Sequence, residues 1–331
     1  MSTTLTQTME VEEEEMYLSS DLESIQKLEK NAVEKPQALT IVPRNIVIYS
    51  IIHLGGLYGL YHLLFFATWQ TCVYVFFLHY IGALGITAGC HRLWAHRSYK
   101  ARLPTRIALM ILATVSFQNS VIEWVRDHRC HHKWTDTDAD PHNSRRGFFY
   151  SHVGWLLVRK LPQLKEMGKK IDLSDLYNDP VLVFQEKHLI PMVLIWNFLI
   201  PSVIPVFFWG EHPLVAYTVA VSFRYALNLN CTWLINSAAH MFGNKPYDAR
   251  ISPTENPLTN ALAAGEGGHN FHHTFPQDYR TSEFGYLTNW TLWILDGLAK
   301  TGQIYDLKKA TPEMIQRQMA KLGDGTHHKH H

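Results

Sequence analysis

The chain has 331 residues, and its 30 lysines and arginines nearly balance its 29 aspartates and glutamates, which gives a formal net charge of +1. A nearly neutral chain has no electrostatic reason to bind a polyanion, so we expect no nucleic-acid partner. The charges are unevenly distributed, however, because long uncharged stretches alternate with polar ones. This distribution favours a membrane protein over two soluble domains.

The N-terminal segment is acidic, with Glu10 and Glu12 to Glu15 close together, and it has no cationic region followed by an apolar core. A cleaved signal peptide would need both features, so we predict none. We expect residues 1–40 to form a disordered acidic segment, residues 41–310 a membrane domain and residues 311–331 a C-terminal tail. The histidines that end the tail are given no role in the chemistry.

Two apolar regions are long enough to cross a bilayer twice each. No Asp, Glu, Lys or Arg occurs from Asn45 to His91, which predicts spans over about residues 46–66 and 72–90. A second apolar region predicts spans over about residues 189–209 and 214–238. The sequence therefore predicts an all-α integral membrane protein with four transmembrane helices in two hairpins. Buried core helices of a soluble protein remain the alternative explanation of these runs.

The distribution of cations between the loops predicts the orientation of the chain. The two short turns between paired spans contain no Lys or Arg, whereas residues 91–187 are rich in both. By the positive-inside rule, residues 91–187 and 239–310 should form a cytoplasmic helical cap, with both termini on the same side.

Nine histidines fall on the side of the cap, and six of them form two triplets with identical H-x-x-H-H spacing: His128, His131 and His132, and His269, His272 and His273. The other three follow predicted spans and are His91, His96 and His240. Residues at i, i+3 and i+4 share one helix face, so each triplet can direct three imidazoles at one centre. Nine imidazoles exceed what one ion needs, which favours two metal ions. Asn236, one helical turn before His240, is a candidate for a group that binds metal through water.

The ligand types favour iron over zinc. A closed zinc site needs only four ligands and often uses thiolates, whereas this set is nearly all imidazole and suits two ions with open or water-bound positions. Histidines without a partner at ligand spacing, such as His142 and His212, are expected to be structural. A membrane haem protein or metal carrier is an alternative, but it would need single histidines on facing spans at membrane depth.

The segments that contain these histidines resemble the membrane acyl-CoA desaturases, and in detail the insect branch of that family, including moth pheromone-gland enzymes. The likeness extends from about Arg44 to Leu307 and includes the block Asp138 to Trp155. The most specific segments are Gly85 to Gly89, His91 to His96, His128 to His132, Asn236 to His240 and His269 to His273.

The resemblance implies a multi-pass enzyme of the endoplasmic reticulum membrane, in lipid or pheromone-precursor biosynthesis. It would use O2, and electrons from NADH through cytochrome b5 reductase and cytochrome b5, to convert a fatty acyl-CoA into an unsaturated acyl-CoA. The nine histidines would then bind two iron ions, with Asn236 acting through water. This fits the chemistry, because an unactivated methylene has no acidic proton and requires an oxygen-activating metal. The related hydroxylation, conjugated double bond and triple bond reactions remain alternatives.

The resemblance also assigns substrate contacts. Residues that would meet the CoA head or line the acyl tunnel are Arg44, Asn45, Gln118, Asn119, Trp124, Arg126, Asp127, Arg159, Lys160, Thr232 and Trp233. His79 and Ala83, one helical turn apart on the second span, would close the far end of the tunnel. The cations among these residues could equally form a solvated or lipid-facing rim.

Overall fold

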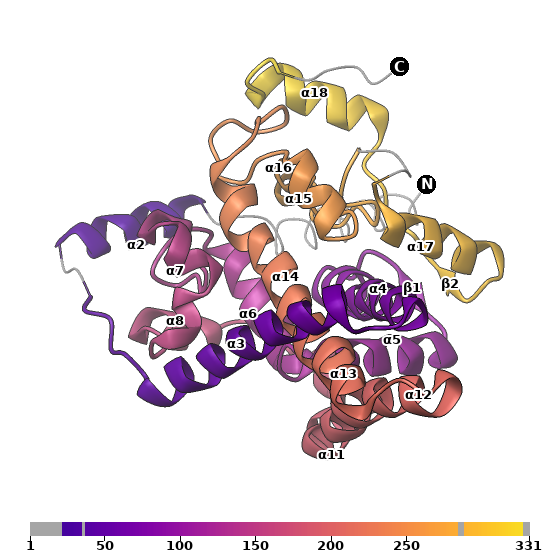
Figure 1. Ribbon diagram of the computed structural model, residues 1–331. Coiled ribbons are helices and arrows are strands. Elements are labelled where there is room, and N and C mark those ends of the chain that lie inside the picture. Colours follow the sequence, from indigo (N-terminus) through magenta and orange to yellow (C-terminus); the bar gives the residue numbers. More distant parts are fainter. Residues whose placement is uncertain (1–21, 35–36, 284–287, 327–331) are drawn as a thin grey trace.

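A computed structural model describes residues 22–34, 37–283 and 288–326 of the chain, and this part of it is almost entirely helical (Figure 1). Its one sheet has two short antiparallel strands, β1 (Lys100–Ala101) and β2 (Ile304–Tyr305). Residues 1–21 and the histidines of the tail lie outside the described residues. The all-α class predicted from the sequence is therefore confirmed.

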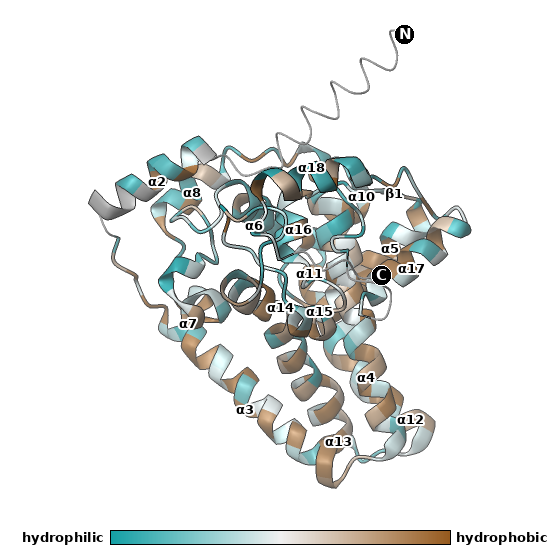
Figure 2. Ribbon diagram, turned by 90° about the horizontal axis from the view of Figure 1, so that it is seen from above, coloured by the Kyte–Doolittle hydropathy of each residue, from teal (hydrophilic) through white to brown (hydrophobic). Residues whose placement is uncertain are grey.

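Three helical segments are long and apolar enough to cross a membrane: Pro43–Phe65, Trp69–Ala95 and Leu189–Trp209. They comprise α3 (Pro43–Phe65), α4 (Trp69–Leu84) with the π-helix η1 (Gly85–Ala95), and α11 (Leu189–Val193), η4 (Leu194–Leu199) and α12 (Ile200–Trp209). Figure 2 shows the apolar α3, α4 and α12 projecting away from a more hydrophilic region, which contains α2 (Leu22–Glu34), α8 (Pro162–Gly168) and α18 (Pro312–Leu322). These segments include the first three predicted spans.

The fourth predicted span is one continuous helical run formed by α13 (Pro213–Tyr217), η5 (Thr218–Phe223) and α14 (Arg224–Met241). It is not among the three segments above, because polar residues such as Arg224 and Asn228 lower its mean hydropathy. Arg224 is fully buried and donates hydrogen bonds to the Val115 carbonyl at 2.9 Å and to Asn197 Oδ1 at 2.6 Å. Arg224 and Asn228 are therefore buried inside the protein.

The turns of the two hairpins are joined to each other by Glu211. Its carboxylate accepts hydrogen bonds from the Thr68 backbone N–H at 2.9 Å and from the Thr71 hydroxyl at 2.5 Å. Thr68 also caps α4, because its side chain accepts from the backbone N–H of Thr71. One carboxylate thus fixes both hairpin turns relative to each other.

Two further helices, α5 (Leu103–Ser116) and α6 (Val121–Lys133), meet at an angle of 83° and carry the chain from the membrane segments into the cap. The π-helix η1 crosses α5 at Gly85, where an added Cβ would lie 2.1 Å from the Ala113 nitrogen. Only glycine allows this approach. This close packing of η1 on α5 brings the histidines at the end of the second span close to α6.

The remaining cap elements are short, and the four nearest the C-terminus gather at one end of the molecule (Figure 1). They are α15 (Pro257–Leu262), α16 (His269–Thr274), α17 (Trp290–Lys300) and α18 (Pro312–Leu322). Between α6 and α11 lie η2 (Ser144–Arg146), α7 (Phe148–His152), η3 (Gly154–Leu157), α8 (Pro162–Gly168), α9 (Ser174–Tyr177) and α10 (Pro180–Lys187). The largest apolar core joins η1, α5, α6, α10 and α17.

Parts of both terminal segments form helices that their polar composition does not predict. Leu22–Glu34 forms a helix, α2, within the segment expected to be disordered, and its Leu28 packs against a buried cluster around Trp134. Part of the expected C-terminal tail forms α18, whose Ile315 packs with Tyr247 and Phe271. In each case a few apolar side chains in a polar segment fix a helix on the cap.

Candidate metal centre

Both histidine triplets lie on helices, as their spacing predicts. His128, His131 and His132 occupy the last turns of α6, which begins at the cap Ser120, whose hydroxyl accepts from the backbone N–H of Glu123 at 3.2 Å. The second triplet forms most of α16. The π-helix η1 carries His91, and π-helical turns are frequent at functional sites because they widen the helix locally.

The nine histidines gather into two groups that could each hold a metal ion. We call them the five-histidine group, formed by His91, His96, His128, His132 and His272, and the four-histidine group, formed by His131, His240, His269 and His273. Each group draws on both triplets, and within each group the nitrogen atoms lie within 4.8 Å of one another. The sequence did not predict this division.

The spacing of the imidazole nitrogens fits metal coordination. Neighbouring Nε2 atoms lie 2.8 Å apart between His91 and His272, 3.0 Å between His272 and His132, and 3.0 Å between His269 and His240. With metal–nitrogen bonds of about 2.1 Å, adjacent ligands of one ion lie about 3.0 Å apart. The Nε2 atom of His131 is buried and has no hydrogen-bond partner among the described residues, so it can serve as a metal ligand.

In three of these histidines, a buried carboxylate faces Nδ1, the ring nitrogen on the far side from Nε2. His91 Nδ1 lies 2.8 Å from Glu266, His131 Nδ1 lies 2.9 Å from Asp140, and His240 Nδ1 lies 3.3 Å from Asp136. Carboxylates in this position fix the tautomer and raise the basicity of a metal-binding imidazole. The sequence pattern did not indicate any of these three carboxylates, although Asp136 and Asp140 lie within ten residues of the first triplet, where a turn can bring them back to it.

Most of the clustered imidazoles are held in the neutral form that metals bind. Burial, together with neighbouring histidines, holds the pKa well below its ordinary value for His96, His128, His132, His269, His272 and His273. His131 is the exception. Burial lowers its pKa, but Asp140 outweighs that effect and raises it. The surroundings of His131 therefore favour a positive charge, which a proton or a metal ion can supply.

Two of these carboxylates, Asp136 and Glu266, remain ionised despite their burial. Burial acts to raise the pKa of Asp136, but His240 and hydrogen bonds from Ser252 and Ser144 outweigh it and lower that pKa below its usual range. The pKa of Glu266 is likewise lowered, because Arg92 and His91 outweigh the effect of its burial. The centre therefore combines neutral imidazoles with fixed negative charges.

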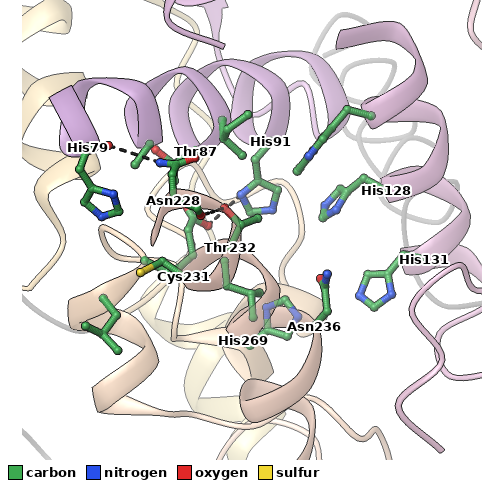
Figure 3. A pocket seen from close by; sticks show the side chains of 17 residues that line it. His79, Thr87, His91, His128, His131, Asn228, Cys231, Thr232, Asn236 and His269 are labelled. Atoms are coloured by element: carbon green, nitrogen blue, oxygen red, sulfur yellow. Dashed lines mark hydrogen bonds and ion pairs between the residues drawn. The ribbon is translucent and has the colours of Figure 1, made fainter. Parts of the chain in front are cut away.

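A cavity leads away from the histidines into the membrane segments. Its lining includes His79 and Ala83 near one end and His128 and His131 near the other, and Figure 3 shows His79 and His131 on opposite sides of the pocket. Asn236 projects among His128, His131 and His269 (Figure 3). The residues assigned to the tunnel end thus lie in the same cavity as the histidines.

A second and larger cavity opens on the other side of the centre. Seven of the eleven assigned substrate contacts line it: Gln118, Asn119, Trp124, Asp127, Lys160, Thr232 and Trp233. The two cavities share Trp124, His128, Thr232 and Asn236. They therefore meet beside the metal centre, and an elongated ligand could occupy both.

The other four assigned contacts, Arg44, Asn45, Arg126 and Arg159, line neither cavity. The side chain of Asn45 donates to the Leu156 carbonyl at 2.7 Å, and Arg126 is paired with Glu123 and Asp127. Because Leu156, Glu123 and Asp127 line the second cavity, both side chains lie beside its wall without lining it.

Hydrogen bonds fix the junction between the cavities. Gln118 Nε2 donates to Thr232 Oγ1 at 2.8 Å, and its Oε1 accepts from the Trp124 indole at 3.2 Å. The Trp124 ring stacks on His128 with centroids 4.9 Å apart. Trp124 lines both cavities and stacks on a clustered histidine. Its position therefore determines where a bound ligand would lie relative to the five-histidine group.

Comparisons with known proteins agree with this arrangement. A family model described as "Fatty acid desaturase" matches residues 31–297. A Delta(9)-fatty-acid desaturase of Caenorhabditis elegans is 55% identical over 310 residues, which cover 94% of this chain and 91% of the relative. An acyl-CoA Delta(11) desaturase of Choristoneura rosaceana is 50% identical over 313 residues, 93% of each chain. An acyl-CoA Delta12-desaturase of Acheta domesticus is 50% identical over 296 residues, 89% of this chain and 83% of the relative.

Proposed function

Because this chain belongs to the fatty acid desaturase family, we propose that it is an acyl-CoA desaturase, an oxidoreductase that inserts a double bond into the acyl chain of a fatty acyl-CoA. The observation that carries the proposal is the junction of two cavities beside two histidine groups. A long chain that lies in both cavities would pass its middle carbons along the metal centre.

The two histidine groups would hold two iron ions, with Asn236 completing the four-histidine group through water. When bound, iron supplies the oxidising power of O2 that an unactivated methylene requires. The overall reaction consumes O2, two electrons and two protons, removes two hydrogen atoms from the acyl chain, and yields two molecules of water. The chain itself positions the substrate and excludes solvent, since eight of the nine clustered imidazoles are buried.

The cavity walls would decide which carbons react. Trp124, fixed by Gln118, lies against His128, and Thr232 lies on the wall shared by both cavities. At the distal end, His79 and Ala83 would limit how far the chain extends. The depth from Trp124 to that end would therefore set chain-length preference, while the thioester is held in the larger cavity near Lys160 and Asp127.

The enzyme would lie in the endoplasmic reticulum membrane with the cap and both termini in the cytosol. The hairpin turns near Thr68 and Glu211 carry no Lys or Arg, whereas the cap is rich in both, which supports this orientation. Electrons would then reach the cap from NADH through cytochrome b5 reductase and cytochrome b5. The acyl-CoA would arrive from the same side.

Expression in yeast that lacks its own acyl-CoA desaturase tests the proposal. We expect monounsaturated fatty acids to appear, and mass spectrometry after double-bond derivatisation gives their position. The His272→Ala variant, expressed to the same level, serves as the inactive control. Cells that form no new unsaturated fatty acid, or only hydroxylated or acetylenic products, would contradict desaturation.

A further inference from the structure

The carboxylates that face the clustered histidines are divided unevenly between the two groups. Asp140 Oδ2 lies 2.9 Å from His131 Nδ1, and Asp136 Oδ2 lies 3.3 Å from His240 Nδ1. Both histidines belong to the four-histidine group. Two of its four imidazoles therefore face a buried carboxylate.

These two carboxylates form one rigid unit in the loop after α6. The backbone N–H of Asp136 donates to Asp140 Oδ2 at 2.8 Å, and Asp136 Oδ1 accepts from the Ser144 N–H at 2.7 Å. The Ser252 hydroxyl donates to Asp136 Oδ2. Asp136 has a φ of 57°, in the left-handed region that residues other than glycine seldom adopt. The loop accepts this strained conformation and fixes both side chains against their histidines.

The five-histidine group differs in its charge. Its one facing carboxylate, Glu266, lies 2.8 Å from His91 Nδ1, but it also accepts from Arg92 Nη2 at 2.8 Å and Arg92 Nε at 3.1 Å. Arg92 is fully buried, so solvent does not screen this pair. Within the described part of the chain, no Lys or Arg is paired with Asp136 or Asp140. The buried charge is thus −2 beside the four-histidine group and zero beside the other.

Fixed negative charge in a buried site stabilises the more highly charged state of a nearby cation. A carboxylate that accepts from the far nitrogen of a ligand imidazole also makes that imidazole a stronger donor to the metal. Both effects act on the four-histidine group more than on the five-histidine group. The two positions therefore differ in the oxidation state that they favour.

We propose that the two metal positions are electronically inequivalent, and that Asp136 and Asp140 make an iron in the four-histidine group easier to oxidise than an iron in the five-histidine group. An iron in either position would exchange one electron between Fe(II) and Fe(III). The iron in the four-histidine group would have the lower reduction potential. Asp136 and Asp140 are positioning residues in this account, since they touch ligands and no substrate. The inference rests on the proposed two-iron function.

A redox titration of protein loaded with two iron-57 ions, without substrate and without O2, tests the inference by Mössbauer spectroscopy. In the wild type we expect one of the two iron signals to become ferric before the other. Asp140→Asn and Asp136→Asn should shift the signal that oxidises first, and Glu266→Gln should shift the other. Each variant should also speed the loss of one iron of the two to a chelator by roughly 10- to 100-fold.

Asp138→Asn is the matched control, because Asp138 lies between the two carboxylates in sequence, is buried, and pairs with Arg146 at 2.7 Å rather than with a histidine. It should leave both signals in place. The inference would be overturned if the two irons of the wild type became ferric at the same potential. It would also be overturned if Asp140→Asn and Glu266→Gln both shifted the signal of the same iron. The wild-type titration needs no variant, so a variant that fails to fold leaves the test intact.

The outcomes also separate this inference from the proposed function. Wild-type protein that binds two irons and makes unsaturated acyl-CoA, but whose irons titrate together, contradicts only the inequivalence. Protein that binds fewer than two irons contradicts both.

Discussion

The Nε2 atoms of His91 and His272 lie 2.8 Å apart although 181 residues separate the two histidines along the chain. His91 lies at the end of a membrane segment, and His272 lies on α16 of the cap. The five-histidine group is therefore complete only when the cap is docked on the membrane helices. Metal binding and this docking should stabilise each other, because an ion held from both sides resists their separation.

Removing one ligand from either group should abolish turnover. His272→Ala takes a ligand from the five-histidine group and His131→Ala takes one from the four-histidine group. We expect each variant to fold, to lose one bound iron and to make no unsaturated product, as measured by metal analysis and product assay.

His212→Ala is the control for these ligand variants. Within the described part of the chain, its side chain accepts only from the Leu214 N–H at the start of α13, so its loss should cost about 1 kcal/mol or less and leave activity nearly unchanged. Equal inactivation of all three variants would mean that membership of a histidine group does not distinguish ligands.

A bulky side chain at position 83 should shorten the acyl chain that the enzyme accepts. Ala83 lines the distal cavity, and Ala83→Phe would occupy space that a long chain needs. In competition assays with acyl-CoAs of two chain lengths, the variant should prefer the shorter one, with unchanged iron content. The double-bond position counted from the thioester should not move. An unchanged preference ratio would exclude Ala83 from the tunnel end.

Replacing Arg224 should destabilise the membrane helices without disturbing the metal centre. Arg224→Met would leave the Val115 carbonyl and Asn197 Oδ1 without a donor, at a cost of roughly 1–3 kcal/mol for each buried group. The thermal unfolding midpoint in detergent should fall, while folded protein keeps its iron. Arg317→Met, at an exposed position of α18, should change the midpoint little. Equal midpoints for the two variants would show that the buried hydrogen bonds of Arg224 contribute nothing.

The metal-free protein should lose stability as the pH falls from about 7.5 to about 5.5. The lowered pKa of buried imidazoles such as those of His96, His132 and His273 means that the unfolded chain takes up protons that the folded chain refuses. His131 acts in the opposite sense because its pKa is raised, but it is outnumbered. Thermal unfolding of chelator-treated protein at several pH values measures the effect. A midpoint that rises toward low pH would contradict the account.

The sequence predicted the histidines of the centre because their helical spacing is local. It also predicted the first three spans, because apolar composition alone decides them, and the family resemblance is confirmed by the nematode and insect relatives. The division into five and four histidines depends on how α6 and α16 dock, which no local pattern encodes. The roles of Asp136, Asp140 and Glu266 were missed for the same reason. Arg224 made the fourth helix less apolar than a span usually is.

The central claim is that two iron ions, one in each histidine group, carry out the desaturation. Its most direct test is the metal content of active protein that ends at residue 326 and so lacks the histidines of the tail. We predict two irons per chain, with activity proportional to iron across partly loaded samples. Full activity with one ion per chain, or with zinc in place of iron, would contradict it.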